Sequence, residues 1–195
     1  MARSSTRGRR PPPRTASPST DSPPSGAGPA SGPSLASATL PRVWQGIGYR
    51  VLDDPAVARP SFDFAAVPWP PASGELVYAW GAFAPSAEGE RLVGAMVAER
   101  GGRAMFLHGP VVTSDAAPLE IAAQLVGAGL DHASALGART VFARPQGLDR
   151  VWVRFGFIPV PEGALPAALA GRPGRGLFAW RGGSALWSLR DAEPD

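Results

Sequence analysis

The sequence contains no cysteine and no lysine. Without cysteine the chain has no disulfide, no thiolate nucleophile and no cysteine-bound zinc, so redox chemistry says nothing about its compartment. All 19 basic residues are arginine, and alanine, glycine and proline are abundant, which is typical of a GC-rich coding sequence. Every cysteine-dependent chemistry is therefore excluded before any motif is considered.

Aromatic residues are missing from residues 1–40, which consist mostly of serine, proline, glycine and alanine. Such a segment cannot bury enough apolar surface to offset its conformational entropy, so we expect a disordered Arg/Pro/Ser-rich tail there and a single domain in residues 41–195. The tail has a net charge of +4 and the domain one of −1. A basic arm can bind nucleic acid or an anionic membrane surface. We favour the simpler interpretation, that the arginines keep a flexible tail soluble.

A long apolar segment is also lacking. No run reaches the roughly 18 apolar residues of a membrane span. Arg9 and Arg10 are followed by three prolines, where an export signal has its apolar region. The prolines also prevent the amphipathic helix of an organelle transit peptide. We therefore expect a cytoplasmic protein that does not bind membranes.

The domain alternates short strand-like segments with one long helical segment. Residues 119–136 carry an apolar stripe at helical spacing, and Gly137 ends it. Residues 53–74 contain five prolines, which leaves room for at most a short helix near Ala56. About seven strands are predicted: 46–52, 75–83, 91–98, 104–112, 140–143, 177–181 and 184–189. The fold class is therefore α/β.

The segment 104–112 is apolar on both faces, which predicts a central strand covered from both sides. Gly109-Pro110 interrupts it, and since proline cannot donate to a strand ladder, it marks a bulge or a place where neighbouring strands part. Ser114 or Asp115 can cap the helix that follows, with Pro118 tolerated in its first turn.

The order of elements from Arg103 to Phe157 resembles the acyl-CoA-binding half of the GNAT N-acetyltransferase superfamily. In that superfamily the strand before the main helix splays from the strand after it, the pantetheine arm of CoA lies in the gap, and the pyrophosphate binds at the helix start. The resemblance implies a mixed, largely antiparallel sheet with helices packed on its faces, and acetyl-CoA or another acyl-CoA as cosubstrate. It also implies CoA-binding positions at Val111, Val112, Thr113, Ala122 and Gln146.

Three positions depart from the superfamily's pattern. Ala117 stands where glutamine or arginine is usual, and Glu120 replaces the central glycine of the phosphate loop, which puts a carboxylate where a diphosphate approaches. Trp152 replaces the tyrosine that protonates the departing CoA thiolate, and an indole N–H has no usable acidity. We interpret Trp152 as a core or pocket-wall aromatic. Because of these departures, an alternative remains in which the helix 119–136 only packs the core and binds no phosphate.

Glu99 and His108 are the candidates for a general base that deprotonates an amine acceptor. Histidine's usual pKa of about 6.5 suits this task. Two alternatives remain: His108 as a hydrogen-bonded core residue, and Glu99 as a solvated turn charge. His132 is expected to face solvent, and the two histidines lack the spacing of a metal pair, so no metal is predicted.

The function that this resemblance implies is transfer of an acyl group from acyl-CoA to an amine, by direct attack of the amine within a ternary complex. The main alternative is a non-catalytic GNAT-like module that binds an acyl-CoA or a protein partner. Nucleic-acid association through the arginine-rich tail is a third and weaker hypothesis.

Overall fold

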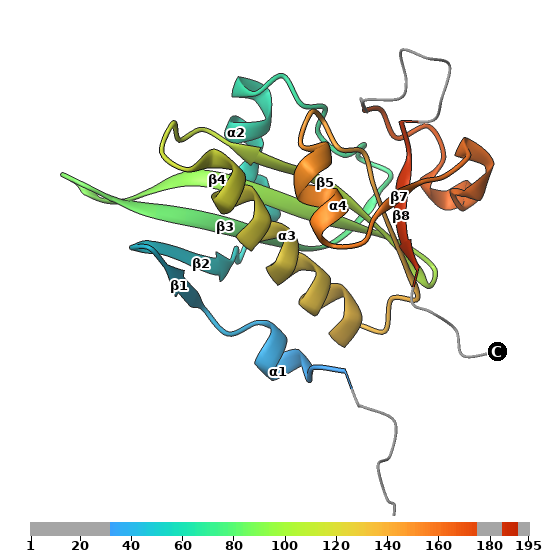
Figure 1. Cartoon of the computed structure of the whole chain (residues 1–195), viewed down its shortest axis with the longest axis horizontal. Helices are drawn as coiled ribbons and strands as arrows, with labels where there is room; N and C mark the ends of the chain where they lie inside the picture. The colour runs from blue at the N-terminus through green and yellow to red at the C-terminus, as the bar shows by residue number, and fades with distance from the viewer. Residues whose placement is uncertain (1–31, 175–184, 191–195) are drawn as a thin grey trace, which may run out of the picture. The chain divides into compact units, whose positions relative to one another are not determined.

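The computed structural model describes residues 32–174 and 185–190, whose arrangement is shown in Figure 1. Eight strands within these residues form one sheet in the order β1-β2-β3-β4-β5-β6-β8-β7. The predicted strand at 177–181 and the glycine turn after it lie outside the described residues. The strands are β1 (Arg42–Trp44), β2 (Ile47–Val51), β3 (Glu75–Ser86), β4 (Gly89–Gly101), β5 (Ala104–Val112), β6 (Thr140–Ala143), β7 (Ile158–Pro159) and β8 (Trp187–Arg190).

Every pair of neighbouring strands is antiparallel except β5 with β6, which is parallel. This confirms the mixed, largely antiparallel α/β sheet. The bounds of β5 and β6 agree with those predicted. The sequence did not predict β1 and β7, because strands of three and two residues are too short to show alternation.

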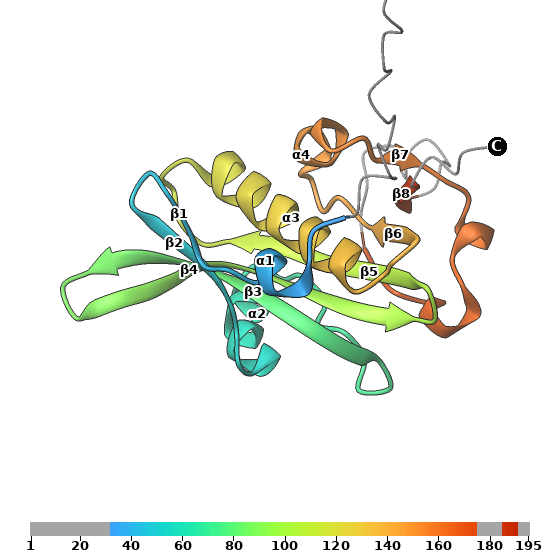
Figure 2. The same cartoon turned by 90° about the horizontal axis from the view of Figure 1, so that it is seen from below.

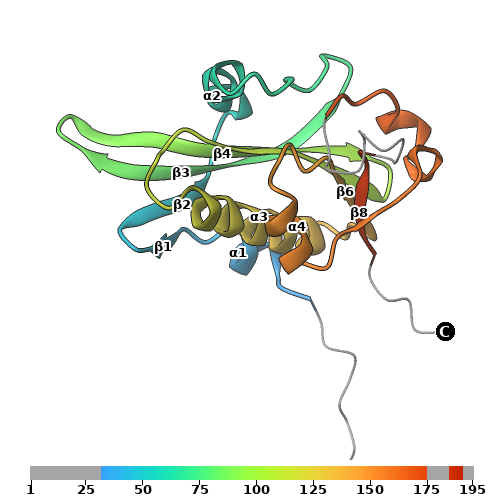
Figure 3. The same cartoon turned by 45° about the horizontal axis from the view of Figure 1, so that its top comes forward.

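Helices cover both faces of the sheet (Figure 2 and Figure 3). On one face lie α1 (Leu35–Ala38), α3 (Pro118–Ala135) and α4 (Asp149–Arg154); on the other lie the 3-10 helix η1 (Pro55–Ala58) and α2 (Arg59–Phe64). The larger core cluster lies between α3 and the sheet, and a second cluster forms around Phe62 of α2. Both faces of the central strands are thus buried.

Helical structure in residues 53–74 extends further than predicted. The predicted extent of at most a short helix near Ala56 is too small, because η1 continues directly into α2, which ends at Phe64. Asp54 caps η1, its Oδ1 accepting from the Ala56 N–H at 2.8 Å. Pro60 lies in the first turn of α2, where no intrahelical N–H is required.

The helix α1 lies inside the segment that composition assigns to the tail. Ser34 caps it, with Oγ accepting from the Ser37 N–H at 3.3 Å, and Ala38 is buried. Because α1 packs against α3, the domain begins before residue 40. The predicted boundary at residues 40 and 41 is therefore too late, since one helical turn of small residues gives no apolar pattern.

The start of α3 also differs from the prediction. Its N-cap is Ala117, with a left-handed φ of 48°, and no side chain caps the helix. Ser114 instead accepts a hydrogen bond from the Ala116 N–H at 3.2 Å, so neither Ser114 nor Asp115 is the cap. Farther along, Gly129 lets α3 approach β3 closely, and the Tyr78 hydroxyl donates to the Gly129 carbonyl at 2.6 Å.

Candidate active site

The two central strands β5 and β6 diverge halfway along β5. Their pairing covers only Ala104–Leu107 against Thr140–Ala143, whereas β5 continues to Val112. Among the described residues no strand pairs with the outer edge of residues 108–112. On the other edge, the β4–β5 register shifts between Ala95 and Val97. Gly109-Pro110 thus lies where neighbouring strands part and opposite a bulge, in agreement with the prediction.

A small cavity lies at this divergence. It is lined by residues 106–109 of β5, by Val67 and Pro68 after α2, and by Arg144, Gln146 and Pro173. Its volume of about 10 Å³ is close to what one water molecule requires. The cavity brings together two predicted site residues, His108 and Gln146, which are 38 positions apart in the sequence.

Glu99 and His108 form a buried pair beside this cavity. Glu99 of β4 is 0% exposed and His108 of β5 is 6% exposed, and His108 Nε2 lies 2.9 Å from Glu99 Oε2. Because an ionised carboxylate only accepts hydrogen bonds, Nε2 carries the proton and Nδ1 presents a lone pair. Nδ1 has no hydrogen-bond partner among the described residues. The alternative of Glu99 as a solvated turn charge is therefore wrong.

Arg172 holds the opposite side of the Glu99 carboxylate. Its Nε donates to both carboxylate oxygens, at 3.1 and 2.9 Å, and its Nη2 also donates to Oε1. The guanidinium also donates to two backbone carbonyls, from Nη2 to Ala168 at 3.0 Å and from Nη1 to Ala170 at 2.9 Å. Arg172 follows the 3-10 helix η3 (Ala167–Leu169) and is 9% exposed. The C-terminal part of the described chain therefore supplies the counter-charge of Glu99.

A second arginine joins the same network. Arg144, directly after β6, donates from Nε to the Arg172 carbonyl at 2.7 Å. Its two Nη atoms donate to the Glu162 carboxylate, each at 2.8 Å. Glu162 begins the 3-10 helix η2 (Glu162–Ala164). Arg172, Arg144 and Glu162 were not predicted as site residues, because isolated charges in a Pro/Gly-rich stretch carry no pattern that links them to a strand about 70 residues earlier.

This network controls the charge of the pair. Burial opposes ionisation of Glu99, but the hydrogen bonds from Arg172 and His108 outweigh it and lower the pKa of Glu99 from 4.5 to about 2. Burial lowers the pKa of His108 below its usual 6.5, Glu99 opposes this, and the positive charge of Arg172 adds to the lowering. At neutral pH the pair thus consists of a carboxylate and a neutral imidazole, the form that accepts a proton.

The residues predicted to bind CoA fall into two groups. Gln146 lines the cavity, and Val111 and Val112 form the diverging end of β5. Thr113 follows the strand, and its N–H donates to the Val93 carbonyl at 2.9 Å. Ala122 is fully buried in α3 and packs in the core. The end of β5 thus has an unpaired edge among the described residues, and the Ala122 side chain packs in the core.

The start of α3 carries a charged pair. Glu120 Oε1 accepts from Arg154 Nη1 of α4 at 3.1 Å, and both side chains are about half exposed. The buried Tyr49 hydroxyl has no hydrogen-bond partner among the described residues, and its pKa is raised by burial and by the Glu120 charge. The Glu120 carboxylate therefore places a negative charge in the first turn of α3.

Trp152 and His132 are both buried on the face of the sheet that α3 covers. Trp152 is fully buried and packs edge-on against Phe157 with ring centres 4.7 Å apart, which agrees with its interpretation as a core aromatic. The expectation that His132 faces solvent is wrong. Its ring stacks on Tyr78 at 4.0 Å and accepts from Trp80 Nε1 at 3.3 Å, because this position of α3 points toward β3.

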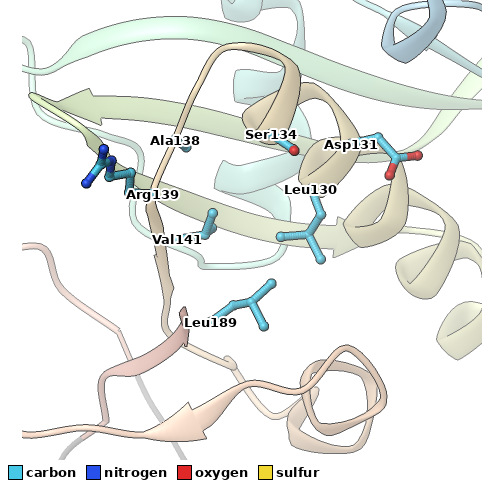
Figure 4. Close-up of a pocket in the computed structure, with 7 residues that line it drawn as sticks. All are labelled: Leu130, Asp131, Ser134, Ala138, Arg139, Val141 and Leu189. Atoms are coloured by element: carbon cyan, nitrogen blue, oxygen red, sulfur yellow. The ribbon is translucent and has the colours of Figure 1, made fainter. Parts of the chain in front are cut away.

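A second hollow lies between α3 and the strands β6 and β8 (Figure 4). Leu130, Val141 and Leu189 form its apolar part, and Asp131 and Ser134 lie at its rim. It contains none of the predicted site residues. In residues 32–174 and 185–190 no group of His, Asp or Glu could hold a metal ion, and no helix is long and apolar enough to cross a membrane.

No protein-family model matches the sequence, and no curated protein matches it. Among solved structures, a GNAT-family acetyltransferase from Staphylococcus aureus Mu50 has a TM-score of 0.50 and 10% identity, over 73% of this chain and 98% of that one. An acetyltransferase from Streptococcus agalactiae 2603 has a TM-score of 0.51 and 12% identity, over 75% and 99%. The chain therefore has the GNAT fold.

The likeness to N-acetylglutamate synthase from Neisseria gonorrhoeae, with a TM-score of 0.49 and 15% identity, covers 73% of this chain. The matched part is 35% of the length of that synthase.

Proposed function

We propose that this chain is an N-acyltransferase that moves an acetyl or longer acyl group from acyl-CoA to an amine. The GNAT fold and the two similar acetyltransferase structures support this class of reaction. The observation that carries the proposal is the position of His108: it lines the cavity at the strand divergence, its Nε2 is bonded to Glu99, and its Nδ1 is left without a partner among the described residues.

In the proposed reaction the amine nitrogen attacks the thioester carbonyl, and the carbon–sulfur bond breaks. His108 Nδ1 takes the proton of the amine, directly or through the one water that the cavity accommodates. Glu99 stabilises the imidazolium that results, as the carboxylate does in a catalytic triad. The departing thiolate needs one proton, which His108 or solvent returns, because Trp152 is buried and its indole N–H is not acidic.

The acyl-CoA would lie along residues 109–112 of β5, whose outer edge has no strand partner among the described residues. Gln146 contributes an amide near the cavity. Glu120, held by Arg154, is unfavourable to a diphosphate at the start of α3. The alternative function is a non-catalytic module that binds an acyl-CoA or a protein partner. The proposal places the protein in the cytoplasm. Nucleic-acid binding through the arginine-rich tail is the third and weakest hypothesis.

Thermal shift with acetyl-CoA and free CoA separates these functions. A ligand at 100 times its Kd adds about 2.7 kcal/mol to the free energy of unfolding, so binding is visible as a higher Tm. Thiol release from acetyl-CoA is then followed with a panel of amines: amino acids, a lysine peptide, spermidine and an arylamine. A shift without turnover indicates the binding module. No shift at millimolar CoA rejects the enzyme and the acyl-CoA-binding module, and leaves only a module that binds a protein partner.

His108→Ala should lower turnover by at least about 100-fold, the usual contribution of a general base, and should leave the acetyl-CoA thermal shift in place. His132→Gln is the matched control, because it changes the only other histidine, which lies on the opposite face. Equal turnover in the His108 variant and the control would show that His108 is not the base.

A further inference from the structure

Arg172 is fixed more firmly than a simple counter-ion requires. Its side chain donates to both oxygens of Glu99 and to the carbonyls of Ala168 and Ala170. Its own carbonyl is held by Arg144, which is anchored in turn on Glu162. Backbone and side-chain contacts therefore set the position of the guanidinium without help from Glu99, and the fork can orient the carboxylate.

The orientation of Glu99 matters because it selects one ring nitrogen of His108. With Arg172 on one side of the carboxylate, Oε2 faces His108 Nε2 at 2.9 Å. Gly74 closes the remaining side: a Cβ at this position would lie within 2.7 Å of the Glu99 carboxylate carbon. The carboxylate is thus confined between Arg172, His108 and the backbone at Gly74.

We propose that Arg172 is a positioning residue for the acyl transfer, which holds Glu99 so that the proton of His108 stays on Nε2 and Nδ1 accepts the proton of the amine. The inference rests on the proposed function. Arg172 acts through Glu99 and contacts neither the acyl group nor the amine.

The charged groups around His108 come from four elements: Glu99 of β4, Arg144 after β6, Glu162 of η2 and Arg172 after η3. The loop after α2 contributes only Val67 and Pro68 to the cavity, and neither is charged. Formal charges in the network sum to zero when the imidazole is neutral. Removing the Arg172 charge leaves the field of Glu99 at His108 unopposed, which favours the imidazolium.

Nuclear magnetic resonance of the full, unliganded chain tests this directly, because the chain has two histidines and His132→Gln assigns their signals. In the wild type, the ring nitrogens of His108 should show a single Nε2–H form, with a titration midpoint below 6.5. Arg172→Gln should raise the midpoint by about one pH unit. Arg172→Lys keeps the charge but not the fork, so the midpoint should stay near that of the wild type while both ring forms appear.

We expect the same shift in the pH profile of kcat/KM, measured with acetyl-CoA and the best amine of the panel. In Arg172→Gln the midpoint of its acid limb should move to higher pH by the same amount as the titration midpoint of His108. A purely structural role would lower activity at every pH without moving this limb. A midpoint and limb that stay in place or move down overturn the proposal. If Arg172→Gln does not fold, a mixture of ring forms in the wild type overturns it. If the wild type shows a single Nε2–H form but no turnover, the proposed function is rejected, while the conclusion that Arg172 and Glu99 orient His108 stands.

Discussion

The carboxylate of Glu120 determines how favourable the first turn of α3 is for the binding of an anion. A helix N-terminus favours negative charge, and Glu120 already places one there, held by Arg154 at 3.1 Å. In the proposed binding mode, an acyl donor with a diphosphate approaches this carboxylate, whereas a donor that ends at pantetheine does not.

Glu120→Gln should therefore tighten the binding of CoA. Removing one like charge near the helix start contributes about 1 kcal/mol, which corresponds to about a fivefold lower Kd. Isothermal titration measures this, with S-acetylpantetheine as the control ligand because it lacks the diphosphate. Arg154→Gln should act in the opposite sense, since it leaves Glu120 uncompensated. Equal changes for CoA and S-acetylpantetheine would contradict this electrostatic explanation.

Single residues were predictable from the sequence only where a neighbouring element identified them. His108 interrupts an apolar strand and is followed by Gly109-Pro110, so its place near a strand divergence could be inferred. Its contact with Glu99 follows from a hairpin register, which the sequence leaves undetermined by one or two residues. Arg172 could not be found, because its contact spans 73 residues and its segment has no periodicity.

At the scale of elements, α3 contains two glycines in different surroundings. A Cβ at Gly129 would lie 2.0 Å from Met96 Cε, inside the fully buried core. A Cβ at Gly127 would meet only the Phe155 ring, at 3.5 Å. The first glycine is thus required for packing against the sheet, and the second is not.

Gly127→Ala should raise the free energy of unfolding by up to about 1 kcal/mol, because alanine is the better helix former. Gly129→Ala should lower it by about 1 kcal/mol or more, since Met96 must leave its position in a packed core. Chemical denaturation of the two variants gives the comparison, and each serves as the control of the other. If Gly129→Ala were as stable as Gly127→Ala, the close approach of α3 to Met96 would be in doubt.

Long elements were predictable because their patterns repeat. The segment 104–112 and the long helix appear close to their predicted bounds. Elements of two to six residues, such as β1, β7 and α2, offer one turn or one alternation at most. Their formation depends on tertiary partners that composition and periodicity do not identify.

At the scale of the whole molecule, the boundary of the domain can be tested by truncation. Removing residues 1–31 should leave Tm unchanged, whereas removing residues 1–40 should lower it, because the longer deletion takes away α1 and the buried Ala38. Both deletions remove the same five arginines, so any nucleic-acid binding through the tail is lost equally in both. Equal Tm values for the two truncated chains would contradict a structural role of α1.

The divergence of β5 and β6 leaves the sheet incomplete at its centre rather than at its border. Sheets normally protect their unpaired main chain by placing it on short or charged outer strands. Here the open edge of residues 109–112 lies between two buried layers. Pro110 has no amide hydrogen. We expect the outward-facing amide hydrogens of the other residues of this edge to exchange with solvent faster than those of 104–107 in the same strand, and to exchange more slowly when an extended molecule pairs with them. Such a molecule would act as a temporary strand, and the continuity of the central sheet would then depend on a component that the gene does not encode.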